Sequence, residues 1–506
     1  MKKLLSVDQV RQWDAATISS EPIDSIDLME RAAKACVVWL FRNGFAHRSF
    51  TVVCGAGNNG GDGLAIARLL ARASCQIQAV VIAGDTQRAS ADFTENLRRL
   101  NRLHEEVPVV RDFTEVQTID VCIDALFGTG LDRKPEGGFQ AAIEAINAKS
   151  CTIVSIDVPS GLPGMPVAFE PVSMVDADHT LTFQQWKEGF FHPKPLANLK
   201  RDRCVHVLDI GLLDGFRSSV DCTTFTFDRN DAAARISDRK RFSHKGSFGA
   251  AFIAAGSGAM PGAAILSINA ALHSGCGLVF AHVPASVLQT VQQSAPEAMT
   301  AADAHPSALS HPSIPEKVTA MACGPGIGTG DEQRTFLLAL LDDPRPLVLD
   351  ADALNLASIH PLILQKIKSH RNSVLTPHPA EFDRLFGRHE GHLQRLDTAK
   401  RQAADLNAVI HLKGAYSVTV TPDGKTIYHT TGSAAMAVGG SGDALTGLIA
   451  GLWASGYSRE DAVLLGVALH GTAGECFEME FGRMGLTAGE LIKRVPQAWK
   501  ILQDAR

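Results

Sequence analysis

Short runs of apolar residues recur throughout this chain, and stretches with apolar residues at helical spacing separate them. Residues 49–54 and 78–82 are two such runs, and residues 63–72 between them carry the helical pattern. A run that is apolar throughout is typical of a strand buried on both faces, as in parallel sheets covered by helices. The further runs are residues 119–123, 151–155, 204–210, 251–255, 278–281, 319–323, 346–350, 374–376 and 409–412. The pattern predicts an α/β fold built on parallel sheets.

The chain has 506 residues, which is too many for a single hydrophobic core, so at least two domains are expected. A polar passage at residues 213–221 interrupts the alternation of strands and helices. We therefore predict a first domain at residues 1–218 and a second domain at residues 225–506. In both domains helices should cover the two faces of a mostly parallel sheet, and we expect the first to be a Rossmann-like, three-layer αβα domain.

The composition gives no reason to expect a nucleic acid or a membrane as a partner. The net charge is −6, and no apolar run is long enough to span a membrane. Charged residues from Asp8 to Asp14 follow the first residues too closely for a signal peptide. The ten cysteines are scattered without any Cys-x-x-Cys pair, which favours reduced thiols over a disulfide framework. We expect a cytoplasmic protein.

The first half contains a glycine-rich segment between a predicted strand and a predicted helix. Residues 55–63 read Gly-Ala-Gly-Asn-Asn-Gly-Gly-Asp-Gly, and glycine permits positive φ and close approach of a ligand to the backbone. The N-terminus of the following helix favours a phosphate group. The segment matches the Gly-x-Gly-x-x-Gly pattern but adds Asn58, Asn59 and Asp62. The alternative is a tight strand-to-helix turn without a ligand.

Two aspartates follow later strands of the same half. Asp124 precedes Ala-Leu-Phe-Gly-Thr-Gly-Leu, and Asp157 precedes Val-Pro-Ser-Gly. Either could be only a helix cap or a turn former. Because ligands bind beyond the carboxyl ends of strands in an open parallel sheet, we expect both to meet the glycine-rich segment in one crevice.

The second half contains a glycine-rich segment that opens a helix. Residues 438–451 read Val-Gly-Gly-Ser-Gly-Asp-Ala-Leu-Thr-Gly-Leu-Ile-Ala-Gly. Backbone N–H groups from Gly440 to Asp443, together with the helix dipole, could hold a phosphoryl group. Asp443 could then accept the proton of a substrate hydroxyl. The alternative is an ordinary helix start, with Asp443 as an acidic residue of the first turn. No P-loop lysine motif is present.

Residues 57–63, 124–130 and 157–161 together resemble the NAD(P)H-hydrate epimerase domain. The resemblance implies that Asp157 contacts the hydrated dinucleotide near its reacting ring, and Asp157 is our candidate for the proton-transferring group. It also implies a potassium ion, and its ligands would be Asn59, Asp124 and Ser160. The other residues implied to bind the hydrated dinucleotide are Asn58, Asn59, Gly60, Gly61, Asp62, Gly128, Thr129, Gly130, Leu131, Asp132, Arg133 and Lys134.

The second half resembles the ribokinase superfamily, whose members close with a Gly-x-Gly-Asp anion hole. Further segments resemble one branch of it, the NAD(P)H-hydrate dehydratases. These segments are residues 243–246, 256–263, 323–328, 350–355, 376–381 and 413–417. The residues implied to face the hydrated nicotinamide are Ala263, Gly326, His378 and Asp443. Those implied to line the nucleotide site are Lys413, Gly414, Ala415, Tyr416, Ser417 and Gly442.

Taken alone, His378 would be a structural histidine and Lys413 a surface lysine, but their positions at strand ends favour the site. Ala380 stands where the family usually has glycine, and Tyr416 where it has a small residue.

The two resemblances cover nearly the whole chain and imply a bifunctional metabolite-repair enzyme. The first half would interconvert the R and S forms of hydrated NADH and NADPH. The second half would phosphorylate the 6-hydroxyl of the S form and eliminate phosphate. The resemblance implies ADP as the phosphoryl donor, with Mg²⁺, and AMP as product; composition and spacing do not distinguish ADP from ATP.

Two alternatives remain open at this point. One is an ordinary small-molecule kinase of the ribokinase superfamily. The other makes the first half a non-catalytic binding module. We also expect a homo-oligomer.

Overall fold

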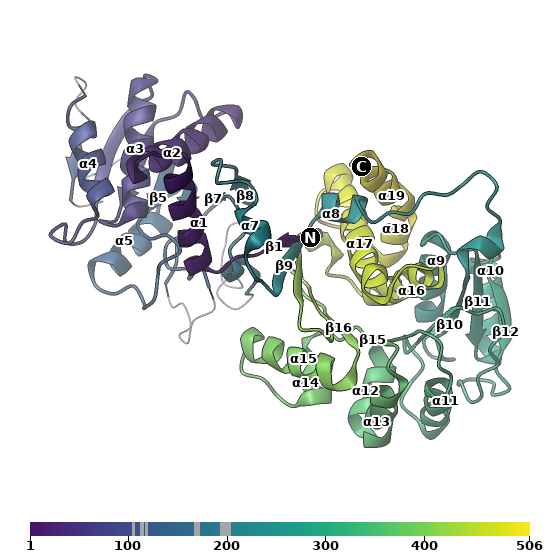
Figure 1. The fold of residues 1–506 in the computed structure, drawn as a ribbon. Helices are drawn as coiled ribbons and strands as arrows, with labels where there is room; N and C mark the ends of the chain where they lie inside the picture. Colours follow the sequence, from purple (N-terminus) through teal and green to yellow (C-terminus); the bar gives the residue numbers. More distant parts are fainter. Residues whose placement is uncertain (104–106, 112–115, 117–119, 166–172, 193–203) are drawn as a thin grey trace. The chain divides into compact units, whose positions relative to one another are not determined.

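The computed structural model describes the whole chain except residues 104–106, 112–115, 117–119, 166–172 and 193–203 (Figure 1). The chain divides into two compact units, which we describe separately. The first unit is Lys3–Cys222, and the second unit is Thr223–Arg506 together with Met1–Lys2. None of the helices in these described residues is long and apolar enough to cross a membrane.

The first unit is built on one sheet, whose strand order is β4-β3-β2-β5-β6-β7-β8. Every neighbouring pair is parallel. Its strands are β2 (Phe50–Cys54), β3 (Ile77–Ile82), β4 (Val109–Val110), β5 (Val121–Ala125), β6 (Thr152–Ile156), β7 (His179–Phe183) and β8 (Cys204–Leu208). Its helices are α1 (Val7–Ser20), α2 (Ser25–Arg42), α3 (Asn58–Arg72), α4 (Ala91–Leu100), α5 (Gly138–Asn147), η2 (Glu188–Phe191) and α7 (Phe216–Ser219).

Helices cover both faces of this sheet. Val52 and Cys54 of β2 pack in one core with α2, α3 and α4. Val53, between them, points to the opposite face and packs in a second core with α5. This alternation is what a strand buried on both faces requires. The predicted three-layer αβα arrangement of the first half is confirmed.

The second unit is built on a larger sheet, with strand order β1-β9-β18-β17-β16-β15-β14-β13-β10-β11-β12. The pairs from β12 to β16 are parallel, and β17 is antiparallel to both of its neighbours. The strands are β1 (Lys2–Lys3), β9 (Thr224–Phe227), β10 (Ala250–Ala254), β11 (Leu278–Val283), β12 (Met299–Ala302), β13 (Ala320–Cys323), β14 (Leu347–Leu349), β15 (Ser373–Leu375), β16 (Val409–Leu412), β17 (Val418–Val420) and β18 (Thr426–His429).

The helices of the second unit also lie on both faces of its sheet (Figure 1). α9 and α16 to α19 pack on one face, where they share a core with the strands. α11 to α15 lie on the other face. The helices are α8 (Arg229–Ala233), η3 (Lys245–Phe248), α9 (Pro261–His273), η4 (Ala285–Val287), α10 (Leu288–Ser294), α11 (Asp331–Leu341), α12 (Ala351–Ile359), α13 (Pro361–His370), α14 (Pro379–Phe386), α15 (His392–Leu406), η5 (Ala434–Met436), α16 (Ser441–Ala454), α17 (Arg459–Phe481), α18 (Ala488–Lys493) and α19 (Val495–Asp504).

One predicted boundary is wrong. The sequence pattern predicts a helix over residues 63–72, but α3 begins at Asn58, inside the glycine-rich segment. Its first turn packs tightly against the end of β2, since a Cβ placed on Gly60 would lie 1.7 Å from the carbonyl oxygen of Gly55. Only glycine permits this approach. The glycines that favour a turn in the sequence are therefore part of the first turn of α3.

Candidate active sites

The candidate site of the first unit lies where three neighbouring strands end. β2, β5 and β6 are parallel neighbours, so their carboxyl ends meet at one edge of the sheet. Gly128, in the loop after β5, lies between two predicted side chains. A Cβ placed on Gly128 would be 3.4 Å from Cβ of Asn59 and 3.4 Å from Oδ2 of Asp157. The glycine-rich segment and the two later loops therefore converge, as predicted.

Asp124, at the end of β5, is a buried carboxylate surrounded by donors. It accepts hydrogen bonds from Ser155 Oγ at 2.7 Å, from Ser160 Oγ at 2.5 Å and from the Ser160 amide at 2.9 Å. Burial raises the pKa of Asp124, and these donors oppose the rise. Asn59 is buried as well, and its side-chain amide has no hydrogen-bond partner in the described part of the chain. The site thus contains buried oxygen atoms, of which the Asn59 oxygen is unpaired.

Asp157 is fixed both by its backbone and by an ion pair. Its φ is 65°, which is uncommon for a residue with a side chain, and its amide donates to the carbonyl of Leu181 at 2.7 Å. Lys187 Nζ lies 3.0 Å from Oδ1 of Asp157, and the Lys187 side chain is only 5% exposed. The same Nζ donates to the carbonyl of Phe183 at 2.8 Å. A strained backbone and a buried charge partner both restrict where the Asp157 carboxylate can lie.

Two further carboxyl groups, Asp14 of α1 and Asp62 of α3, lie close enough to Asp157 for its charge to raise their pKa values. Burial raises the pKa of Asp14 to about 6; the Lys187 ammonium opposes this rise and the Asp157 carboxylate adds to it. Burial also raises the pKa of Asp62 well above its ordinary value, and the Asp157 charge adds to that rise. Both carboxyl groups can therefore hold a proton at a pH where an ordinary aspartate is ionised.

The loop at residues 128–134 borders α1. A Cβ placed on Gly130 would lie 3.3 Å from Nη2 of Arg11, which is on the same face of α1 as Asp14. Leu131 is half-buried, and the three polar residues that follow are exposed; they are Asp132, Arg133 and Lys134. α1 therefore forms a wall of the site that the sequence did not predict.

The candidate site of the second unit is built around the start of α16. Gly440, with φ of 86°, precedes the helix. Asp350, which is 1% exposed, accepts hydrogen bonds from Lys413 Nζ at 2.6 Å and from Thr446 Oγ1 at 2.7 Å. A Cβ placed on Gly442 would lie 3.1 Å from Lys413 Nζ. Asp350 therefore connects the ends of β14 and β16 to the first turns of α16.

Asp443 lies in the first turn of α16, as predicted. Burial raises the pKa of Asp443 to about 6, and the nearby charge of Asp350 adds to the rise. The ammonium group of Lys413 opposes it, whereas Asp352 and Glu381 add to it. These effects require the four carboxyl groups and the lysine to lie close together, so the segments after β14, β15 and β16 meet at α16.

Ala263 and Gly326 lie against each other, as a common site requires. Gly326 has φ of 62°, and a Cβ placed on it would be 2.8 Å from Cβ of Ala263. His378 caps α14: its Nδ1 accepts hydrogen bonds from the amides of Ala380 at 3.1 Å and Glu381 at 3.3 Å. Ala380 serves this cap where the family has glycine, so the departure leaves the cap intact.

The predicted nucleotide loop connects β16 and β17. Gly414 and Ala415 are exposed, and Tyr416 and Ser417 are half-buried. Lys413, at its start, donates its amide proton to the carbonyl of Pro377 at 3.0 Å. This contact holds the loop beside the segment that carries His378.

Sequence reasoning missed the roles of Asp14, Lys187 and Asp350 in these sites. Asp14 and Lys187 are far from Asp157 in the chain, and only tertiary structure brings them together. For Asp350 a signal existed, because the predicted strand at residues 346–350 ends in this aspartate.

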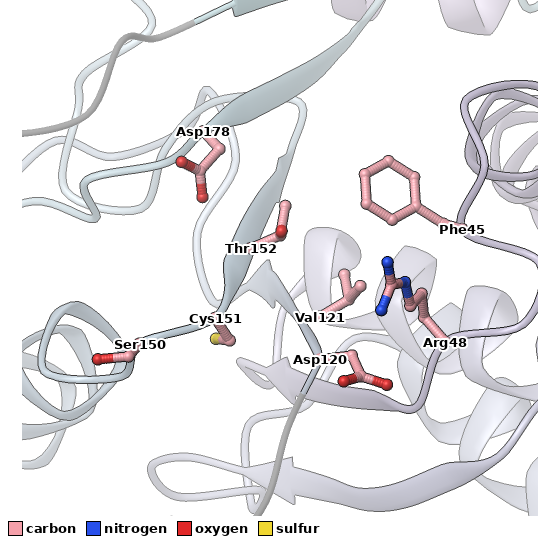
Figure 2. Close-up of a pocket in the computed structure, with 8 residues that line it drawn as sticks. All are labelled: Phe45, Arg48, Asp120, Val121, Ser150, Cys151, Thr152 and Asp178. Carbon is pink, nitrogen blue, oxygen red and sulfur yellow. The ribbon is translucent and has the colours of Figure 1, made fainter.

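A pocket of about 430 Å³ opens elsewhere in the first unit, and Figure 2 shows its lining. Its residues precede or begin strands β2, β5, β6 and β7. The lining residues are Phe45, Arg48, Asp120, Val121, Ser150, Cys151, Thr152 and Asp178. This pocket therefore lies at the amino ends of the strands, at the opposite edge of the sheet from the candidate site.

Known proteins resemble both units. A family model described as NAD(P)H-hydrate dehydratase matches residues 251–497, and one for the N-terminus of YjeF-related proteins matches residues 25–189. A bifunctional NAD(P)H-hydrate repair enzyme from Thermofilum pendens is 31% identical over 99% of this chain and 97% of its own length. The chain belongs to the family of bifunctional NAD(P)H-hydrate repair enzymes. Both resemblances found in the sequence, and the fold class predicted for each half, are confirmed.

Other members of the repair-enzyme family match over similar lengths. The repair enzyme of Moorella thermoacetica is 32% identical over 99% of this chain and 97% of its own length. The Escherichia coli enzyme is 30% identical over 96% of this chain and 91% of its own length. Among solved structures, the ADP/ATP-dependent NAD(P)H-hydrate dehydratase of Bacillus subtilis, co-crystallized with ATP and Mg²⁺, is 32% identical; the match covers 54% of this chain and 97% of that one, with a TM-score of 0.47.

Proposed function

We propose that this chain repairs hydrated NADH and NADPH. Its first unit epimerises the R and S hydrates, and its second unit dehydrates the S hydrate at the expense of ADP. The observation that carries this proposal is the presence of a polar site in each unit of one chain, within a family that joins the two activities. A kinase with a non-catalytic first half would not explain the buried ion pair of Asp157 and Lys187.

In the first unit, the start of α3 and the loop at residues 128–134 hold the dinucleotide. The unpaired N–H groups at the N-terminus of α3 suit its phosphates. Asp157 transfers a proton at the hydroxylated carbon of the nicotinamide ring. Its fixed carboxylate is suited to this, because general acid–base catalysis requires a positioned group.

A potassium ion fits the residues of this site. The side-chain oxygen of Asn59 is buried without a partner, and Asp124 and Ser160 supply further buried oxygen atoms beside each other. Such hard oxygen donors suit an alkali cation, which would supply a fixed positive charge near the bound substrate. Asn59, Asp124 and Ser160 would hold the ion.

In the second unit, the S hydrate lies beside Ala263, Gly326 and His378, and Asp443 accepts the proton of its 6-hydroxyl. The oxygen then takes the terminal phosphoryl group of ADP, and AMP leaves. The N–H groups of residues 440–443 stabilise the charge of the transferring group. Phosphate is a better leaving group than hydroxide, so its elimination, with loss of a ring proton, restores the dihydronicotinamide.

The nucleotide is bound by the loop at residues 413–417 and by Gly442. Magnesium would accompany its phosphates and neutralise part of their charge. The Asp350–Lys413 pair fixes this loop against α16, because Lys413 Nζ lies beside both Asp350 and Gly442. The cytoplasmic location and the homo-oligomeric state stay predictions.

The test is the recovery of absorbance at 340 nm from a mixture of R and S NADH hydrate, with Mg²⁺ and either ADP or ATP. Complete recovery with ADP is expected, and recovery should become faster when Na⁺ is replaced by K⁺. Recovery that stops at the S fraction would contradict the epimerase assignment alone. No recovery, with a stable phosphorylated product, would favour the small-molecule kinase.

A further inference from the structure

Inversion at the hydroxylated carbon moves more than one proton. If the ring opens at this carbon, its hydroxyl loses a proton while the ring nitrogen gains one, and both transfers reverse on closure. The two atoms are separated by the carbon itself. A site that catalyses both transfers therefore benefits from two proton-transferring groups that differ in protonation state.

In the candidate site of the first unit, the Asp157 carboxylate is paired with a cation, whereas the Asp14 carboxyl group forms no such pair among the described residues. Asp157 is in the ion pair with Lys187, whose Nζ lies 3.0 Å from Oδ1. Thr182 Oγ1 also lies 3.1 Å from this Nζ, so the lysine is held on several sides. Asp14 lies near both groups, and its carboxyl group forms no ion pair within 4 Å among the described residues.

The surroundings of Asp14 favour its protonated form. The charged or titratable groups that face it are Asp157 and Lys187 from the segments after β6 and β7, and Asp62 from α3. Burial and the negative charge of Asp157 outweigh the effect of Lys187, so the pKa of Asp14 is raised to about 6. Arg11, on the same face of α1, lies beside the predicted dinucleotide loop at Gly130. α1 therefore presents Asp14 at the site itself.

We propose that Asp14 is a second proton-transferring residue of the epimerase site and that Lys187 is the positioning residue of Asp157. This inference rests on the proposed function of the first unit. It adds an acid to the base Asp157 and gives the buried lysine a role.

The Asp157 carboxylate takes the hydroxyl proton, the carbon–oxygen bond becomes a carbonyl, and the bond from this carbon to the ring nitrogen breaks. The electron pair goes to the nitrogen, which takes the proton of the Asp14 carboxyl. After rotation about the adjacent carbon–carbon bond, the nitrogen attacks the other face of the carbonyl. Its proton returns to Asp14, and the oxygen takes back the proton from Asp157. Nothing is oxidised or reduced.

The experiment measures conversion of purified R NADH hydrate to the S form by chromatography. Nucleotide is left out so that the dehydratase is silent, and the uncatalysed rate is subtracted. The full-length variants are Asp14→Asn, Lys187→Met and Lys187→Arg. The matched controls are Asp214→Asn and Lys34→Met, which change exposed residues of the same unit. Dehydration of S hydrate with ADP and Mg²⁺ shows that the second unit of each variant is intact, and the thermal unfolding transition of the first unit shows that this unit is folded.

We expect Asp14→Asn to lower kcat for epimerisation by about 100-fold or more, the contribution typical of general acid catalysis. The wild-type rate should fall as the pH rises through the pKa of Asp14, and this fall should be absent in Asp14→Asn. Lys187→Met should lower kcat for epimerisation much more than it changes KM, because the Asp157 carboxylate loses the contact that positions it. Lys187→Arg should restore most of the wild-type kcat.

Asp14→Asn and Lys187→Met variants that epimerise as fast as the controls, with unchanged pH profiles, would overturn the inference while the proposed function stands. A wild-type chain that does not epimerise would overturn both. If Lys187→Met does not fold, the Asp14→Asn profile and the Lys187→Arg kcat still decide.

Discussion

Single residues in both sites carry charges that the fold removes from water. Lys187 and Asp350 are 5% and 1% exposed, and each is paired with an opposite charge. Separating such a pair would leave an unpaired buried charge, which is strongly destabilising. Each pair therefore holds the side chain of the partner residue in one position. The partners, Asp157 and Lys413, both lie in predicted binding loops. In the mechanism proposed for each site, the chemistry depends on the protonation of a few carboxyl groups.

Asp443→Asn should abolish dehydration of the S hydrate, because the substrate hydroxyl then has no base. Since the pKa of Asp443 is raised to about 6, the wild-type carboxyl is ionised only above that pH. Wild-type kcat/KM should therefore rise as the pH increases through 6 and level off above it. The measurement is kcat/KM with S hydrate and ADP, from pH 5 to pH 8.

Asp397→Asn is the control for this experiment, because it changes an exposed carboxylate of the same unit. It should retain wild-type rates at every pH. A wild-type profile that is flat between pH 5 and pH 7 would exclude Asp443 as the base.

Asp14→Asn should raise the melting temperature of the first unit at pH 7.5. The folded pKa of about 6 is above the ordinary value of 3.8, so the stabilising contribution of Asp14 is present below pH 3.8 and is lost as the pH rises through 6. Asparagine removes this loss, so the gain should be present at pH 7.5 and absent at pH 4. Thermal unfolding followed at both pH values tests this, and a lower melting temperature at pH 7.5 would contradict it.

The sequence predicted only part of each site. Asp124, Asp157 and Asp443 could be found because each lies at a strand end or helix start, which are local signals. Asp14 and Lys187 could not, since α1 carries no glycine-rich or strand-end pattern and Lys187 acts through a contact with Asp157. Groups that tune another group through space leave no pattern in a single sequence.

At the level of secondary-structure elements, the positions of several strands could be predicted from the sequence. The contact between the start of α3 and the end of β2 could not. β2, β3, β10 and β16 lie within a residue of the predicted runs, because continuous apolar runs identify strands buried on both faces. β7, which reads His-Thr-Leu-Thr-Phe, lacks such a run and was missed. The early start of α3 depends on a backbone contact at Gly60, which composition does not encode.

Gly60→Ala should destabilise the first unit, because its Cβ would overlap the carbonyl oxygen of Gly55 at 1.7 Å. We expect a cost of roughly 1–3 kcal/mol, typical of overpacking. Gly57→Ala is the matched control: its φ is −89°, and a Cβ there meets nothing within 4 Å. The measurement is urea denaturation of both variants. Equal midpoints for the two variants would show that the contact does not limit the start of α3.

At the level of the whole molecule, each unit has its own hydrophobic core. The first is built around two clusters on the faces of its sheet, and the second around a cluster that includes α9, α16 and α17. Two separate cores are what a chain of this length was expected to need. The sequence could not indicate that Met1–Lys2 belongs with the second unit, because a segment of two residues is too short to carry a periodic pattern.

Thermal unfolding should therefore show two transitions, and ADP with Mg²⁺ should raise only the one that belongs to the second unit. A ligand stabilises only the unit that binds it, and the predicted nucleotide loop lies wholly in Thr223–Arg506. Magnesium without nucleotide is the control. A single transition, or an equal rise of both, would mean that the units unfold together.

The position of β1 affects the order in which the newly made chain can fold. β1 begins at Lys2, before the first unit in the chain, but lies next to β9 in the sheet of the second unit, and Lys2 pairs with Asp228 at 2.7 Å. β9 in turn pairs with β18, which ends at His429. At about 5–20 residues per second, the ribosome needs roughly 10–40 s to extend the chain from Cys222 to His429. The first unit can thus finish folding before the strands that β1 joins have been synthesised.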